Sequence, residues 1–396
     1  MDSLKVLYRQ TYPDYYKAKF DQSTISLSQV RSLLKPGQVV LEYAFAFNYL
    51  YILSISPNGR NIDKMLLQKE AKQDISFVLD FVKGRSESLT SRARTSYCES
   101  VSRLYNLLIP SRIAQSTQSN MLLIVPDSSL CYMPFEALLK PQPDKYKPDY
   151  RKLPYLIHDY TVSYGLTATI FYNKPTRVST PSKCILAVAP RYDFSRAGIS
   201  DYLKQSADGL PDLTGTVQES RAIKRMLGGR LLAGDQATEA KFKSLGPHYG
   251  ILHLAMHSIT DKTNSMNSGL VFTPGADRHE DGILFGHEVY NLSLNAWLTV
   301  LSACETGSGQ MASGEGVLSF GRAFIYAGCP NLIMTLWTVD DRSSEDIVES
   351  FYQSLQAGSG VADALRNSKL SYLAKADKLH AHPHYWAGFI ELGQNH

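Results

Sequence analysis

Apolar and polar positions alternate regularly over the second half of the chain. Five short apolar runs predict buried strands at 184–188, 230–233, 250–256, 298–302 and 331–337. Segments with helical spacing between and after them predict helices at 216–227, from Thr238, at 316–327, near 344–356 and at 360–375. Residues 269–285 resemble a hairpin. Strands that alternate with helices predict an α/β fold, with a mostly parallel sheet flanked by helices on both faces.

The first half carries fewer regular elements. Residues 1–36 form a helical lead-in, because Leu27, Val30 and Leu34 share one helix face and Lys35-Pro36-Gly37 then ends the helix. Beyond it we expect strands at 39–46, 49–55 and 121–125, and helices around 71–83 and 91–108.

Two local signals refine this pattern. Thr216 and Glu219 have the spacing of a capping box, and Gly228-Gly229 is typical of a helix end. Residues 140–154 contain four prolines and five basic residues, a composition that predicts an exposed loop.

Composition narrows the class of protein. The chain has 396 residues, 44% of them hydrophobic and 20% charged, which is enough for two or three globular domains. The net charge of +4 comes without a dense Lys/Arg run, so no nucleic-acid site is indicated. Five widely spaced cysteines without a C-x-x-C motif fit free thiols in a reducing cytoplasm. Neither a signal peptide nor an apolar run of about 20 residues is present, so we expect no membrane contact.

Two of the predicted strands end at residues that carry chemistry. Strand 298–302 leads to Cys304, in a loop that contains four glycines by Gly316. Strand 250–256 leads to His257, which is followed by a polar loop that begins at Ser258. A thiol and an imidazole are the parts of an activated nucleophile and its base. Ligands bind parallel sheets beyond the carboxyl ends of the strands, so the two residues can meet there.

Each of these residues also has a structural interpretation. Buried free cysteines are common and inert, and Cys184 and Cys329 fit that description. Cys304 differs because Glu305 and a glycine-rich stretch follow it, and backbone N–H groups there can bind an oxyanion. His253 lies in mid-strand and is expected to be a core histidine, whereas His257 lies at the strand end.

Asp340 and Asp341 follow the strand at 331–337. They are either a helix cap or a negative pocket for a basic substrate side chain, since a buried Arg or Lys needs a paired carboxylate. Gly307-x-Gly309-x-x-Ala312 also matches a dinucleotide fingerprint. Cys304, Glu305 and Thr306 lie between the strand and the first glycine, where the fingerprint turns at once, so this alternative is weak.

Several ordered motifs resemble the CHAT family of caspase-like cysteine peptidases, which are relatives of separase and the caspases. The matching segments are HLAMH (253–257), LSACETG (301–307), GEGV (314–317), LWTVDD (336–341), HPHYWAGF (382–389), LLIVPD (122–127), MPFEAL (133–138) and LPDLTGTVQE (210–219). Together they extend over nearly the whole chain.

The resemblance implies a caspase-haemoglobinase fold, with a degenerate caspase-like unit at 37–178 and an active peptidase domain at 179–396. It implies a His257–Cys304 dyad and an oxyanion hole made of the Ser258 and Cys304 N–H groups, although the family usually has glycine after the histidine. It places Asp341 in the pocket for arginine, with Asp340 beside it. Members often carry tetratricopeptide repeats ahead of this region, and the family points to bacterial regulated proteolysis.

The sequence therefore predicts a cytoplasmic cysteine endopeptidase that cleaves proteins after Arg or Lys. Glu305 is expected to shape the loop of the binding site, and no metal or organic cofactor is required. A regulatory protein or a repeat domain is a candidate partner. The alternative is a catalytically silent CHAT-fold module that binds a partner and signals by conformation.

Overall fold

The structure is a computed structural model. It describes residues 24–84, 90–115, 119–142, 149–172, 184–192, 210, 213–259, 261, 267–275, 280–302 and 318–393. None of the helices in these segments combines the length and the apolar character that a membrane span requires.

Eleven strands of the described chain form one sheet, in the order β3-β2-β1-β4-β5-β14-β13-β12-β8-β6-β7. The strands are β1 (Gln38–Ala46), β2 (Tyr49–Ser56), β3 (Gly59–Leu66), β4 (Met121–Val125), β5 (Thr161–Tyr164), β6 (Ile185–Ala189), β7 (Gly229–Ala233), β8 (Ile251–Leu254), β12 (Leu298–Leu301), β13 (Asn331–Thr335) and β14 (Phe389–Gly393). A second, three-stranded sheet contains β9 (Ser258–Ile259), β10 (Gly269–Val271) and β11 (Ile283–Phe285).

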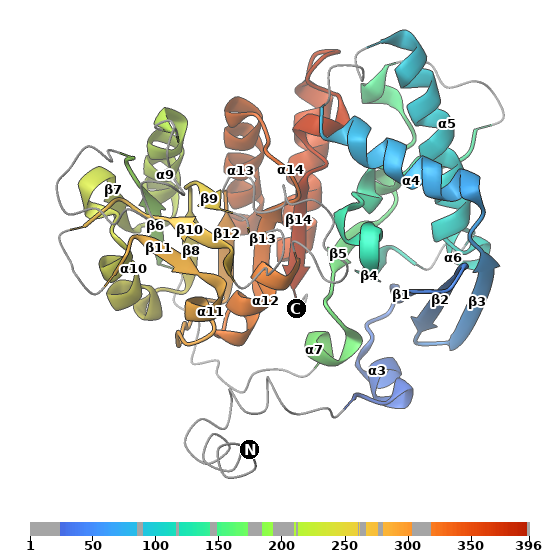
Figure 1. Cartoon of the computed structure of the whole chain (residues 1–396), viewed down its shortest axis with the longest axis horizontal. Helices are drawn as coiled ribbons and strands as arrows, with labels where there is room; N and C mark the ends of the chain where they lie inside the picture. The colour runs from blue at the N-terminus through green and yellow to red at the C-terminus, as the bar shows by residue number, and fades with distance from the viewer. Residues whose placement is uncertain are drawn as a thin grey trace.

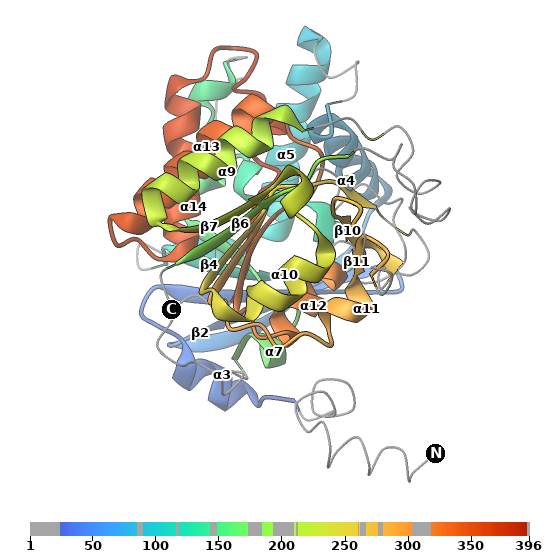
Figure 2. The ribbon, with the colours of Figure 1, turned by 90° about the vertical axis from the view of Figure 1, so that its left-hand side faces the viewer.

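Helices cover both faces of the carboxyl-terminal strands (Figures 1 and 2). On one face lie α9 (Thr214–Leu227), α13 (Asp341–Gln356) and α14 (Val361–Lys375). On the other face lie α10 (Glu239–Leu245), α11 (Gly286–Val289) and α12 (Leu318–Tyr326). Strands β13, β12, β8, β6 and β7 are mutually parallel, so the predicted α/β architecture is confirmed.

Three strands of the eleven-stranded sheet were not expected from the pattern. β5 and β14 are short and almost fully buried, so they show no polar alternation that would set them apart from neighbouring apolar residues. β3 has the opposite problem, since most of its side chains are exposed at the sheet edge and few are apolar. β14 pairs with β13 on one side and with β5 on the other, and thereby joins the two halves of the sheet.

The predicted capping box at Thr216 is wrong. Helix α9 begins at Thr214 with Leu213 as its N-cap, and the Thr216 hydroxyl donates to the Leu213 carbonyl at 2.7 Å. Glu219 is buried in the helix interior instead of folding back on the helix start. By contrast, Ser26 and Gln29 form a full capping box at the start of α3 (Leu27–Leu33), which confirms the helix expected there.

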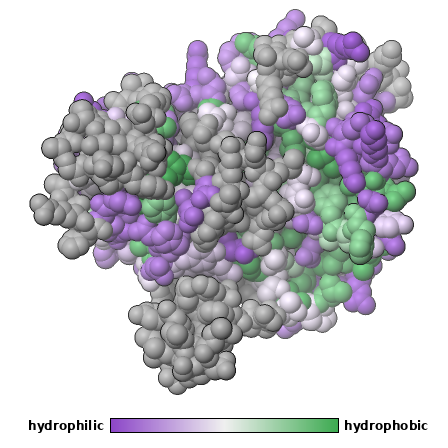
Figure 3. Space-filling model, in the orientation of Figure 1, coloured by the Kyte–Doolittle hydropathy of each residue, from purple (hydrophilic) through white to green (hydrophobic). Residues whose placement is uncertain are grey.

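The amino-terminal strands leave part of one sheet face open. Helices α4 (Lys69–Val82) and α5 (Ser91–Leu108) cover the opposite face (Figure 1). Large apolar side chains that stay exposed include Phe47, Tyr49, Ile62 and Leu66. Apolar surface is correspondingly visible over β1–β3, on the right-hand side of Figure 3.

The expectation of an exposed loop at 140–154 holds only in part for its described residues, since 141, 142, 151 and 152 are exposed whereas Tyr150 and Leu153 are buried. Residues 150–152 form a short 3-10 helix, and Tyr150 and Leu153 are both 3% exposed. Tyr150 packs edge-on against His382 at a ring-centroid distance of 5.1 Å. Proline content therefore marks an irregular backbone here, and Tyr150 and Leu153 anchor its described turn while Arg151 and Lys152 stay exposed. Lys145 and Lys147 lie outside the described residues.

A buried polar cluster connects the two halves of the chain. Lys369 of α14 lies 2.7 Å from Glu136, and the two side chains are 1% and 3% exposed. The Tyr164 hydroxyl of β5 donates to the same carboxylate at 2.5 Å. Burial lowers the pKa of Lys369, although Glu136 opposes the shift. The domain boundary predicted near residue 178 falls outside the described residues and stays a prediction.

Candidate functional site

His257 lies just beyond β8, next to the strand that leads to Cys304. β8 and β12 are adjacent and parallel, with Leu254 paired to Leu301. His257 follows Leu254 by three positions, as Cys304 follows Leu301 in the sequence. Cys304 and Glu305 lie outside the described residues, so the structure does not show their contacts.

The described surroundings of His257 include one tyrosine and the short second sheet. The side chain of His257 is buried, and its ring packs against Tyr192 at a centroid distance of 4.7 Å. The His257 carbonyl accepts from the Val271 N–H of β10 at 2.9 Å. The histidine is thus held from the side by backbone and by an aromatic ring, and does not sit in a loose loop.

Ser258, the candidate oxyanion donor, belongs to β9 and faces Leu270 of β10. Hydrogen-bonded and non-hydrogen-bonded pairs alternate along an antiparallel ladder. Since His257 and Val271 form the hydrogen-bonded pair, Ser258 occupies a non-bonded one, and its N–H points away from β10. This direction suits an oxyanion donor, and the role itself stays a prediction.

His253 is a core histidine, as the sequence indicated. Its side chain is fully buried, with Nε2 2.9 Å from Glu219 Oε1 and Nδ1 3.3 Å from the Tyr352 hydroxyl. Glu219 belongs to α9 and Tyr352 to α13. The imidazole therefore ties β8 to the two helices above it.

The other cysteines divide differently from the prediction. Cys329 is buried, and burial raises its pKa to about 12, so it is the inert thiol that was expected. Cys184 is exposed, because β6 begins only at Ile185. The expectation that Cys184 is buried inside a strand is therefore wrong.

Asp340 and Asp341 lie together at the start of α13, and both are exposed. The Asp340 carboxylate caps the helix, since it accepts from the Ser343 N–H and hydroxyl at 3.1 Å each. Asp341 is the first helical residue and lies near Gly215 of α9, where an added Cβ would sit 3.9 Å from an Asp341 oxygen. The helix-cap interpretation thus holds for Asp340, while the cap leaves the Asp341 carboxylate available.

One group of carboxylates in the described segments is close enough to hold a metal ion: Glu239, Glu280 and Glu288. The Lys243 ammonium lies 2.8, 2.5 and 2.8 Å from these three residues. Burial raises the pKa of Glu239 to about 7, against the effect of Lys243. Because a lysine already supplies the positive charge, the cluster serves to anchor α10 to β11 and α11.

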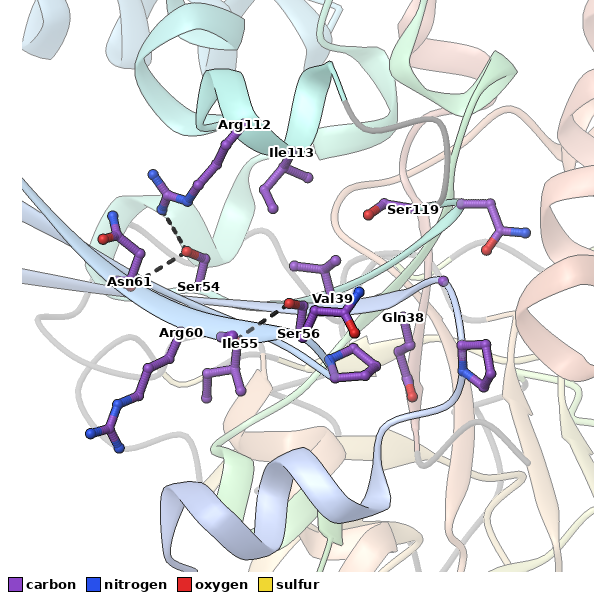
Figure 4. Close-up of a pocket in the computed structure, with 16 residues that line it drawn as sticks. Gln38, Val39, Ser54, Ile55, Ser56, Arg60, Asn61, Arg112, Ile113 and Ser119 are labelled. Carbon is purple, nitrogen blue, oxygen red and sulfur yellow. Dashed lines mark hydrogen bonds between the residues drawn. The ribbon is translucent and has the colours of Figure 1, made fainter.

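A cavity lies away from His257, in the amino-terminal part. It has a volume of about 730 Å³ and lies between the start of β1, the β2–β3 turn and α6 (Ser111–Ala114) (Figure 4). The Arg112 guanidinium donates a hydrogen bond to the Ser54 hydroxyl at 2.5 Å, as Figure 4 shows. It also forms an ion pair with Asp63, so its charge is already matched. Among the predicted site residues that the structure describes, none lines this cavity.

Sequence reasoning overlooked Tyr192. It follows Ala189, the last residue of β6, by three positions, and β6 is the other neighbour of β8. The same argument that selected His257, a polar group just past a strand end, applies to this residue. It was missed because a lone tyrosine hydroxyl is not a recognised part of a nucleophile–base pair.

Comparison with known proteins places this geometry in context. A model of the CHAT domain matches residues 99–394. The chain is also similar to tetratricopeptide repeat protein 28 of Mus musculus, at 24% identity over 214 residues, and of Homo sapiens, at 25%. These matches cover 45% of this chain and 8% of each relative, so the chain spans less than a tenth of their length.

Among solved structures, the chain resembles separase of Saccharomyces cerevisiae, which was solved in complex with securin. The TM-score is 0.51 at 10% identity, over 92% of this chain and 30% of the separase chain. At this identity the likeness shows the fold alone. The predicted caspase-haemoglobinase fold is thereby confirmed.

Proposed function

Because the chain belongs to the CHAT domain family, we propose that it is a cysteine endopeptidase that cleaves protein substrates through His257 and Cys304. The position of His257 beside β12 carries this proposal. Adjacent strands lie about 4.8 Å apart. His257 follows Leu254 by three residues, and Cys304 follows Leu301, the partner of Leu254, by the same number. This equal spacing favours a position of the Cys304 thiol close to the His257 imidazole.

The chemistry follows from these two groups. His257 takes the proton of the Cys304 thiol, and the thiolate attacks the scissile carbonyl carbon. The N–H groups of Ser258 and Cys304 bind the resulting oxyanion. The imidazolium then gives its proton to the leaving amine, which leaves a thioester on Cys304. Water, deprotonated by His257, hydrolyses the thioester and restores the thiol.

The primary specificity is proposed to be for Arg or Lys. Asp341 is the first residue of α13, the helix that follows β13, and β13 is the strand beside β12. Asp341 is exposed and lies near Gly215. Asp340 is engaged with Ser343 and contributes negative charge rather than direct contact. Glu305 is proposed to shape the loop that closes over the substrate.

The segment 37–178 is proposed to be a degenerate caspase-like unit that supports the peptidase domain 179–396 through the shared sheet. The curated relatives are tetratricopeptide repeat proteins, so a repeat domain or a regulatory protein is the proposed partner. We propose that the reaction takes place in the cytoplasm and serves regulated proteolysis in bacteria.

A peptide-library cleavage assay tests this function. Wild type should release fragments that end in Arg or Lys, and Cys304→Ala and His257→Ala should release none. Since the two groups act as a unit, the double variant should be no worse than either single one. Turnover by Cys304→Ala would contradict the peptidase proposal.

A catalytically silent module that binds a partner is the alternative, and the exposed apolar side chains of β1–β3 favour it. Iodoacetamide labelling separates the two, because an activated thiolate reacts faster than an ordinary thiol. Cys184 is exposed and will also react, so modification must be mapped by mass spectrometry. Labelling of Cys304 that slows in His257→Ala supports the enzyme, and equal labelling supports the silent module.

A further inference from the structure

Tyr192 contacts the candidate catalytic histidine with both its ring and its hydroxyl. The two side chains are 7% and 8% exposed, and their rings are inclined at 52° with centroids 4.7 Å apart. The tyrosine hydroxyl oxygen accepts a hydrogen bond from the backbone N–H of His257 at 2.7 Å. The ring contact restricts the orientation of the imidazole, and the hydrogen bond holds the backbone N–H of the same residue.

The hydroxyl takes the place of a strand-ladder bond. The residues of a hydrogen-bonded antiparallel pair normally exchange two bonds. Here the Val271 N–H donates to the His257 carbonyl at 2.9 Å, but the reciprocal bond is interrupted. Tyr192 accepts from the His257 N–H and donates to the Val271 carbonyl at 3.2 Å. A phenol is therefore inserted between β10 and the residue that bears the imidazole.

Insertion of a hydroxyl widens the ladder on one side of His257. It holds the His257 peptide away from Val271 while the other bond of the pair stays closed. The next residue is Ser258, whose N–H points away from β10. The position of the imidazole and the direction of the Ser258 N–H both depend on this local opening.

Tyr192 is itself firmly placed. The N–H of the preceding residue, Arg191, donates to the Thr273 hydroxyl at 2.8 Å, and that hydroxyl donates to the Gly234 carbonyl at 2.9 Å. The tyrosine ring packs in a small apolar cluster with Leu213, Val271 and Ile283. These contacts fix the position of the Tyr192 hydroxyl independently of His257.

We infer that Tyr192 is a positioning residue for His257, which sets the imidazole and the Ser258 N–H for attack by Cys304. This inference rests on the proposed function. Tyr192→Phe keeps the ring and removes the hydroxyl, so the backbone of His257 can move closer to that of Val271 in β10. A displacement of about 1 Å costs about 100-fold in rate. The value of kcat should therefore fall about 10- to 100-fold, with KM within about twofold.

Tyr43→Phe is the matched control. The Tyr43 hydroxyl is also buried and donates to a backbone carbonyl, that of Leu108, at 2.8 Å, but it lies in the amino-terminal part. Both variants lose a buried tyrosine hydroxyl, so both should lose some stability in urea unfolding. Only Tyr192→Phe should lower kcat. An equal fall of kcat in the two variants would show a general loss of packing and would overturn the inference.

A readout independent of turnover completes the test. The imidazole signals of His257, assigned by their loss in His257→Asn, should move in NMR spectra of Tyr192→Phe. They should be unchanged in Tyr43→Phe. If wild type cleaves no peptide but these signals move, the peptidase proposal fails and the placement of His257 by Tyr192 stands. Unchanged His257 signals with kcat within twofold of wild type would overturn the inference.

Discussion

The Nε2 atom of His253 lies 2.9 Å from the Oε1 atom of Glu219, and both side chains are buried between β8 and α9. His257, only four residues further on, lies at the edge of the same region and contacts Tyr192. The two histidines of the HLAMH motif (253–257) therefore have different surroundings. One joins the sheet to its helices, and the other lies beside Tyr192 just beyond the end of β8.

His253→Ala should lower the free energy of unfolding by about 3 kcal/mol, because it leaves a buried carboxylate without its partner. Replacement of both residues by apolar ones, His253→Phe with Glu219→Leu, should recover most of this loss. Urea unfolding of the two variants and wild type measures both effects. A double variant that is less stable than His253→Ala would contradict a buried pair and indicate a packing role.

The adjacent aspartates at the start of α13 should separate stability from specificity. Asp340→Ala removes the helix cap and should cost about 1 kcal/mol in urea unfolding. Asp341→Asn should leave stability within about 0.5 kcal/mol. It should reduce kcat/KM for Arg peptides at least about tenfold, because a substrate cation loses its paired charge. Undiminished cleavage after Arg by Asp341→Asn would place the specificity pocket elsewhere.

Glu391 of β14 should make the protein less stable as the pH rises. Complete burial raises the pKa of its carboxyl to about 8, which Ser163 only partly offsets. Between the ordinary value of 4.5 and about 8, the folded protein keeps a proton that the unfolded chain releases. The contribution is therefore present in full below pH 4.5 and is lost through this window, by about 1.4 kcal/mol per pH unit.

Glu391→Gln tests this, because it keeps the shape and the neutral state of the side chain. Its stability relative to wild type should grow steadily between pH 5 and pH 8 in urea unfolding. Glu70→Gln, at an exposed position of α4, serves as the control and should follow the wild-type curve. Parallel curves for wild type and Glu391→Gln would mean that the carboxyl does not change its proton affinity on folding.

The fold was predictable wherever an apolar run was long and bounded by turn residues. β8, β12 and β13 met that condition, and the order of these strands brought His257 to the carboxyl edge of the sheet. β14 did not, since it lies among aromatic residues that resemble the core on either side. The start of α9 was misplaced because Thr216 and Glu219 have capping chemistry, yet burial of Glu219 beside His253 determines its contacts. Tertiary contacts of this kind have no local signal.

The segment 140–154 offers a final test, because its described part contradicts the idea of a uniformly accessible loop. Arg151 is paired with Asp149 at 2.8 Å and lies between the buried Tyr150 and Leu153. Nicking concentrates in exposed backbone, so cleavage after Arg151 or Lys152 should be slow in the folded protein. If the enzyme cuts itself in this segment, the expected sites are therefore Lys145 and Lys147, and a passive loop that stays intact is the alternative. Mass spectrometry of wild type and Cys304→Ala after incubation measures it, with limited trypsin digestion of Cys304→Ala as an external probe. The variant Tyr150→Ala, Leu153→Ala should become sensitive to trypsin at Arg151, and rapid cutting there in the parent protein would contradict the anchoring of this turn by Tyr150 and Leu153.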